Sequence, residues 1–292
     1  MAEFEVSAAT VAELRRETGA GMMDCKKALQ EAKGDKEAAL AWLRKRGIAA
    51  AEKRAERSAN EGVVAFARSE DGQTGALVEI NSETDFVAKS DAFRSFADTL
   101  AKTVLNWKAA EGKSVDDLKT LSFTGSATVG DVLSELIGKI GEKLEIRRFA
   151  RVQVPGGFVG HYIHADNKLG VMVLLDGISA TNPEAAQLGR DLAMQVAAAS
   201  PAVVRREEVP KEKVESERAI EIERARTEGK PEAAVPKIAE GRINKWFADV
   251  ALLEQPFIKD PKIIVKQIVE DASKRAGVSA IVKSFIRFRV GA

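Results

Sequence analysis

The chain has 292 residues, enough for two or three domains with cores of their own. Its 45 Lys and Arg residues balance 44 Asp and Glu residues, which leaves a formal net charge of +1. That balance argues against direct nucleic-acid binding, because such proteins usually carry a strongly basic domain or face. The single Cys25 excludes an internal disulfide framework and fits a reducing compartment, and we expect it to be a small buried side chain on a helix.

The first six residues, MAEFEV, show no targeting signal. They contain neither a basic nor an apolar stretch, so no signal peptide is visible, and their acidic residues argue against a transit peptide. No apolar run approaches the roughly 18 residues needed to cross a bilayer. We therefore expect a soluble, cytoplasmic protein with no membrane partner.

Residues 1–56 are predicted to form a compact bundle of three short helices. A capping-box pattern at residues 10–13 (TVAE) indicates that the first helix begins with Thr10 as its cap. The second helix is expected at 22–32, ending at Gly34. Apolar contacts around the break at 18–21 are expected from four residues: Val11, Leu14, Met22 and Met23.

A third helix of this bundle is predicted to begin after Asp35, whose carboxylate can cap it, and to end at Gly47. Residues 49–57 (AAAEKRAER) then predict a charged helical linker whose charges form a solvated face.

From residue 61 the apolar period becomes that of strands. Residues 62–68 and 75–80 predict paired strands joined by a turn at 69–72 (SEDG). The other elements predicted in this lobe, residues 57–154, are a helix with a core face (Phe93, Phe96, Leu100 and Val104), a helix at 129–140 and a strand at 144–149.

The same layout recurs in the second half of the chain. Strands are predicted at 157–164 and 168–175, a helix at 185–198 and a closing strand at 284–290. We therefore predict an α+β protein with a duplicated core of two lobes, each placing a helix against an antiparallel sheet. The second lobe comprises residues 155–201 and 251–292.

Between these two parts, residues 202–250 predict an inserted helical hairpin. Helices are expected at 203–228 and 232–253, with a break at 229–231 (GKP). Its apolar positions are sparse (Val214, Ile220, Ile238 and Ile243), which favours a projecting coiled coil. Whether this hairpin forms a homodimer is left open.

Strong enzyme motifs are absent from the sequence. It contains no H-E-x-x-H, C-x-x-C, G-x-S-x-G or Walker A pattern. Its two histidines, His161 and His164, are predicted on opposite faces of a strand, so they do not form a chelating pair, and each is expected to be a surface or capping residue. We predict a protein that is not an enzyme and needs no metal or cofactor.

The most informative segment is the loop at residues 81–89 (NSETDFVAK), between a strand and a long amphipathic helix. It places the carboxylate of Asp85 beside the ring of Phe86. An exposed aromatic residue in a loop indicates a partner contact. The structural alternative, which local chemistry alone favours, is that Asp85 caps the helix and Phe86 packs against the core as a hydrophobic staple.

Ordered motifs along the chain closely resemble those of the bacterial elongation factor Ts family. They lie at residues 10–15 (TVAELR), 18–29 (TGAGMMDCKKAL), 81–89, 240–242 (EGR) and 255–257 (QPF). The resemblance covers essentially the whole chain. It implies a guanine-nucleotide exchange factor that binds elongation factor Tu in its GDP-bound and nucleotide-free forms, disturbs the Mg²⁺ and phosphate site, and promotes GDP release. It also implies a bundle of the ubiquitin-associated (UBA-like) type.

The resemblance further implies which residues contact elongation factor Tu. Phe86 is expected to wedge into the G domain and Asp85 to perturb the groups around the Mg²⁺ ion. The implied contact residues are, in the loop, Thr84, Asp85, Phe86 and Val87, in the bundle, Arg15, Met22 and Met23, and in the second lobe, His164. Many family members continue into an extra C-terminal helix that also contacts the partner, whereas this sequence stops at Ala292, so that contact is expected to be missing.

An alternative from another functional class is a non-catalytic adaptor that binds a partner through the bundle. It predicts binding that ignores the nucleotide state and is unaffected by removal of the Phe86 ring.

Overall fold

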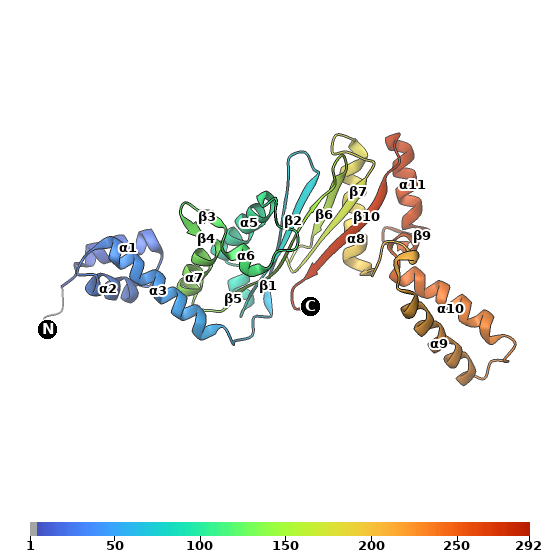
Figure 1. Cartoon of the computed structure of the whole chain (residues 1–292), viewed down its shortest axis with the longest axis horizontal. Helices are drawn as coiled ribbons and strands as arrows, with labels where there is room; N and C mark the ends of the chain where they lie inside the picture. Colours follow the sequence, from blue (N-terminus) through green and yellow to red (C-terminus); the bar gives the residue numbers. More distant parts are fainter. Residues whose placement is uncertain (1–4) are drawn as a thin grey trace.

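The computed structural model describes residues 5–292, so residues 1–4, where the predicted N-terminal module begins, lie outside the described residues. Helices and antiparallel sheets are mixed along the chain, which confirms the α+β class. A helical bundle lies at one end of an elongated molecule, two sheets lie in the middle, and a helical hairpin lies at the other end (Figure 1). None of the helices described is long and apolar enough to cross a membrane.

Three helices form the N-terminal bundle: α1 (Ala8–Thr18), α2 (Met22–Glu31) and α3 (Lys36–Arg54). Cys25 is buried on α2 as predicted. The predicted cap of α3 is confirmed, because the Asp35 carboxylate accepts a hydrogen bond from the Ala38 amide at 2.7 Å.

Two details of the bundle differ from the prediction. Helix α1 begins at Ala8, because the Ser7 hydroxyl accepts from the Thr10 amide at 3.1 Å, so Thr10 is not its cap. Met22 and Met23 do not contribute to the apolar core of the bundle, since they are 45% and 71% exposed.

Helix α3 also continues through Gly47, where the sequence predicted its end. A Cβ atom at this position would lie 2.9 Å from the carbonyl oxygen of Ser134 on α7 (Val129–Ile140). Glycine therefore permits a close crossing of α3 and α7 here, and does not stop the helix. Residues 49–54 of the predicted linker are the last part of this helix, and residues 55–57 follow it towards the first sheet.

The first sheet has the order β1 (Glu61–Arg68), β2 (Thr74–Ser82) and β5 (Leu144–Gln153), all antiparallel. Helices α5 (Asp91–Asn106) and α7 cover one face, and the predicted core face of α5 is buried. Alternate residues of each strand point to opposite faces. Val63, Ala65 and Ala67 accordingly face these helices.

The second sheet repeats this order with β6 (Phe158–Ile163), β7 (Leu169–Asp176) and β10 (Ile281–Arg289). Its outer face is covered by α8 (Pro183–Ala199) and α11 (Val265–Ala276). The strands predicted for the second lobe are therefore confirmed, and so is the helix predicted at 185–198. Their bounds are shifted by a few residues.

The inner faces of the two sheets pack against each other, so the centre of the molecule has four layers, helix–sheet–sheet–helix (Figure 1). The buried residues between the sheets are Val64, Leu77, Val154, Val159, Met172, Leu174 and Phe288.

The inserted hairpin consists of α9 (Lys211–Thr227) and α10 (Val235–Val250), which are shorter than predicted. Ile243 is fully buried, whereas Ile220 is 55% exposed and does not belong to the seam, the contact surface between α9 and α10. Much of the seam is ionic: the buried Glu221 accepts a hydrogen bond from Arg242 at 3.2 Å.

Several elements were not predicted. The longest is α11, the second helix on the outer face of the second sheet. The others are short: α6 (Val115–Lys119), β3 (Ser122–Thr124), β4 (Ala127–Thr128), η1 (Arg206–Glu208), η2 (Leu252–Glu254), β8 (Pro256–Phe257) and β9 (Asp260–Ile264).

His161 is not the surface or capping residue that the sequence predicted. Its ring stacks on Phe66 of the first sheet, with ring centroids 3.9 Å apart, and it is partly buried. Burial lowers the pKa of His161 from 6.5 to about 4. His164, by contrast, is exposed.

This burial predicts a specific pH dependence of stability. The unfolded imidazole takes up a proton near pH 6.5 and the folded one near pH 4, so the unfolded state binds more protons in this window. The stabilisation is complete above pH 6.5 and is lost as the pH falls towards 4. We expect the melting temperature of His161→Phe to fall less over this range than that of the wild type. His164→Phe is the matched control and should behave like the wild type; equal pH dependence in all three proteins would contradict the assignment.

Candidate functional site

The loop after β2 forms a separate single helical turn, α4 (Asp85–Ala88), before the long helix α5 begins at Asp91. The sequence predicted a direct transition into the long helix. Thr84, not Asp85, is the N-cap of α4, because its hydroxyl accepts from the Val87 amide at 3.4 Å. The structural alternative of a capping Asp85 is therefore wrong.

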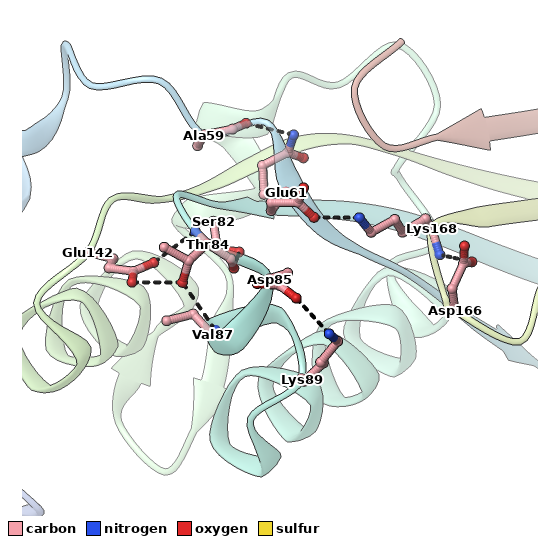
Figure 2. Close-up of polar contacts among 11 residues, drawn as sticks. Ala59, Glu61, Ser82, Thr84, Asp85, Val87, Lys89, Glu142, Asp166 and Lys168 are labelled. Atoms are coloured by element: carbon pink, nitrogen blue, oxygen red, sulfur yellow. Dashed lines mark hydrogen bonds and ion pairs between the residues drawn. The ribbon is translucent and has the colours of Figure 1, made fainter.

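A distant turn braces this loop. Glu142, which follows α7, accepts two hydrogen bonds from Thr84: Oε2 from the backbone amide at 3.1 Å and Oε1 from the hydroxyl at 2.8 Å (Figure 2). In return, the Glu83 carboxylate accepts from the amide of Lys143 at 2.6 Å. Each segment thus binds the backbone of the other, which restricts the loop. Gly141 permits the turn, since its φ is +82°.

Phe86 lies on the outer side of α4, because other residues of this turn face the core. Ala88 is buried and Val87 packs partly against the core of the first sheet. Phe86 is 82% exposed, so it is not a staple to the core. Leaving such a ring in water forgoes about 1.5–3 kcal/mol of burial free energy, for which the fold itself offers no compensation.

Asp85 carries a carboxylate that is paired within the loop. Its Oδ2 lies 2.6 Å from Nζ of Lys89, one helical turn away (Figure 2). The hydrogen bond from Lys89 holds the pKa of Asp85 below its usual range, and the charge of Lys168 adds to this effect. Asp85 therefore holds its carboxylate in the charged form, in an ion pair with Lys89, at the position next to Phe86 in the chain.

The turn between β6 and β7 lies beside the same surface. Lys168 on this turn forms an ion pair with Glu61 at 2.5 Å (Figure 2), and the Asn167 carbonyl accepts from the Val64 amide at 2.6 Å. His164 stands exposed on the same turn, with Nδ1 2.9 Å from the hydroxyl of Tyr162. The structure thus brings the turn of His164 next to β1, whose Glu61 pairs with Ser82 at the end of β2, just before the loop.

The remaining predicted contact residues form a second exposed group. Arg15 lies near the end of α1, and Met22 and Met23 begin α2, so the three flank one turn of the bundle. All three are exposed. The bundle that carries them lies at one end of the molecule, whereas the loop follows β2 of the first sheet (Figure 1).

Sequence reasoning missed the residues that support the loop, above all Glu142. It is 58 positions from Thr84, and no local pattern indicates their contact. Within residues 5–292, no group of three or more His, Cys, Asp or Glu side chains is arranged to hold a metal ion.

Comparisons with known proteins point to one family. The family model described as elongation factor TS matches residues 83–292, well over half of the chain. The chain is 43% identical to elongation factor Ts of Prosthecochloris aestuarii over 289 residues, covering 99% of both proteins. It is 44% identical to that of Chlorobium phaeobacteroides, again covering 99% of both. It is 45% identical to that of Trichlorobacter lovleyi, covering 98% of this chain and 93% of the relative.

The exposure of Phe86 predicts that its ring contributes little to stability. We expect Phe86→Ala to change the free energy of unfolding by no more than about 0.5 kcal/mol. Phe93→Ala is the matched control: this ring is fully buried on α5, and its loss should cost about 3–5 kcal/mol. Chemical denaturation of both variants tests this, and a similar loss in the two would show that Phe86 is a core residue.

Proposed function

The chain belongs to the elongation factor Ts family, and on that premise we propose that it is a guanine-nucleotide exchange factor for elongation factor Tu. It binds the GDP-bound partner, promotes release of GDP and holds the nucleotide-free form. It makes and breaks no covalent bond, so it is not an enzyme, and it acts in the cytoplasm during translation elongation.

The observation that supports this proposal best is the exposure of Phe86 on a braced loop beside Asp85. Aromatic side chains contribute strongly to protein interfaces when they enter a pocket of the partner. A loop already held by hydrogen bonds loses little conformational entropy on binding. The ring is therefore suited to enter the G domain as a wedge.

The energetics of exchange define what this loop has to do. A nucleotide bound at nanomolar affinity is held by about 12 kcal/mol, so unassisted release is slow. Mg²⁺ contributes to that affinity by joining phosphate oxygens to the protein. An exchange factor accelerates release only if it binds the nucleotide-free state better than the loaded state. In our proposal Phe86 stabilises the nucleotide-free arrangement of the G domain, while the charge of Asp85 disturbs the groups around the Mg²⁺ ion.

The other exposed residues supply affinity. Arg15, Met22 and Met23 form a contact of the bundle with a G-domain helix, and two large apolar side chains exposed beside a cation suit such a contact. His164 adds a contact from the second sheet. We also propose that residues 1–56 form a UBA-like module and residues 202–250 a coiled-coil domain. Whether the hairpin forms a homodimer stays open.

Release of a fluorescent GDP from elongation factor Tu, followed by stopped flow, tests the function. We expect an acceleration that saturates with protein concentration and that Phe86→Ala reduces at least about tenfold, equivalent to about 1.4 kcal/mol. Ile220→Ala is the control, because it removes an exposed apolar side chain on the distant hairpin. Binding that ignores the nucleotide state, with no acceleration of release, would instead identify an adaptor.

For Asp85 we expect a smaller defect, because the wedge and the other contacts remain. Asp85→Asn keeps the shape of the side chain and removes its charge. In the same assay it should slow GDP release less than Phe86→Ala does. A loss as large as that of the Phe86 variant would assign the effect on the metal site chiefly to Asp85.

A further inference from the structure

We propose that Glu142 is a positioning residue that holds Phe86 in its active orientation by fixing Thr84. This inference rests on the proposed exchange function and extends it to a residue outside the loop.

The first argument is the size of the element that carries the ring. Helix α4 has only four residues, too few to be stable alone, because helix nucleation is unfavourable. Its orientation therefore depends on its attachments. On the N-terminal side the attachment is Thr84, directly before Asp85 and two residues before Phe86.

The second argument is the orientation of one hydroxyl. Thr84 Oγ1 has a single hydrogen, which it donates to Glu142 Oε1 at 2.8 Å. Its lone pairs are then free to accept from the Val87 amide and cap α4. Glu142 also accepts the Thr84 backbone amide at 3.1 Å, so one carboxylate fixes both the chain and its capping group. Figure 2 shows this series of bonds from Glu142 through Thr84 to Val87.

The third argument is what else the turn of Glu142 contacts. Arg54, at the end of α3, donates to the carbonyl of Gly141 at 2.9 Å. Lys143 donates from Nζ to the carbonyl of Arg57 at 2.9 Å, and Arg57 contacts Glu83 at 3.3 Å. The turn at 141–143 thus joins the helix that carries the bundle to the loop that carries Phe86. Glu142 consequently sets the loop relative to both parts of the proposed contact surface.

The decisive variant is Glu142→Gln in the full chain. In glutamine an amide group replaces one of the two carboxylate oxygens, so in the same side-chain position one donor of Thr84 meets an oxygen and the other meets the amide group. We expect the maximal rate of GDP release at saturating protein to fall about tenfold, since small misplacements of a working group are costly. The concentration for half-maximal effect should change less than about twofold, because the bundle contacts are retained.

Glu270→Gln is the matched control, because it changes an exposed carboxylate on α11 that pairs with Lys266 at 3.9 Å. It should equal the wild type in both parameters. If Glu142→Gln lowers the melting temperature and weakens half-saturation in proportion, the residue serves general stability and the proposal is overturned.

A double-mutant cycle with Thr84 separates positioning from unrelated damage. Thr84→Val removes the hydroxyl and keeps the shape of the side chain. If Glu142 acts through Thr84, the double variant Thr84→Val/Glu142→Gln should be no slower than the slower single variant. Multiplicative losses would mean that the two residues act independently.

Amide hydrogen exchange on the free protein tests the brace without the partner. The amides of Thr84 and Val87 should exchange faster in Glu142→Gln than in the wild type or in Glu270→Gln. If the wild type fails to accelerate GDP release, the proposed function fails while this measurement still reports on the brace. If the wild type accelerates release and Glu142→Gln matches it, the inference fails alone.

Discussion

The packing of two three-stranded sheets against each other determines the rest of this structure. All nine residues of β2 are buried, because one face of the strand packs against helices and the other against the second sheet. Leu77 and Met172 are both buried between the sheets, and each such side chain contributes about 1.5–3 kcal/mol. Helices can then cover only the outer faces. The face-to-face arrangement also places the β6–β7 turn beside β1, the partner of the strand that leads into the loop of Phe86.

Much of the fold was predictable because its strands and helices carry clear periodicity. The core face of α5, with Phe93 and Phe96, was found from helical spacing alone. The errors occur where one residue type serves two structural purposes. Gly47 was interpreted as a helix end, but it allows α3 and α7 to approach closely, a requirement visible only in three dimensions. Similarly, the strand pattern could not reveal that His161 stacks between the sheets while His164 stays exposed.

The motif of the candidate site was predictable from the sequence, whereas the residues that hold its loop in place were not. Residues 84–87 were identified because their order with the other motifs resembles a known family, whereas local chemistry alone favoured a cap and a staple. The structure excludes both of those roles, since Thr84 is the cap and Phe86 is exposed. Glu142 was not identified, because side-chain hydrogen bonds between distant segments leave no periodic or local pattern.

For the proposed exchange function, the brace and the exposed ring together account for how a small contact can be effective. A flexible loop would spend part of its interaction free energy on becoming ordered when it binds. Glu142 and Glu83 have already restricted this loop in the free protein. Under the proposed function, the contacts of Phe86 then contribute more fully to the difference in affinity between the nucleotide-free and loaded states of the partner. Because that difference alone drives exchange, a loop restricted in advance favours activity, under this proposal, without requiring a larger interface.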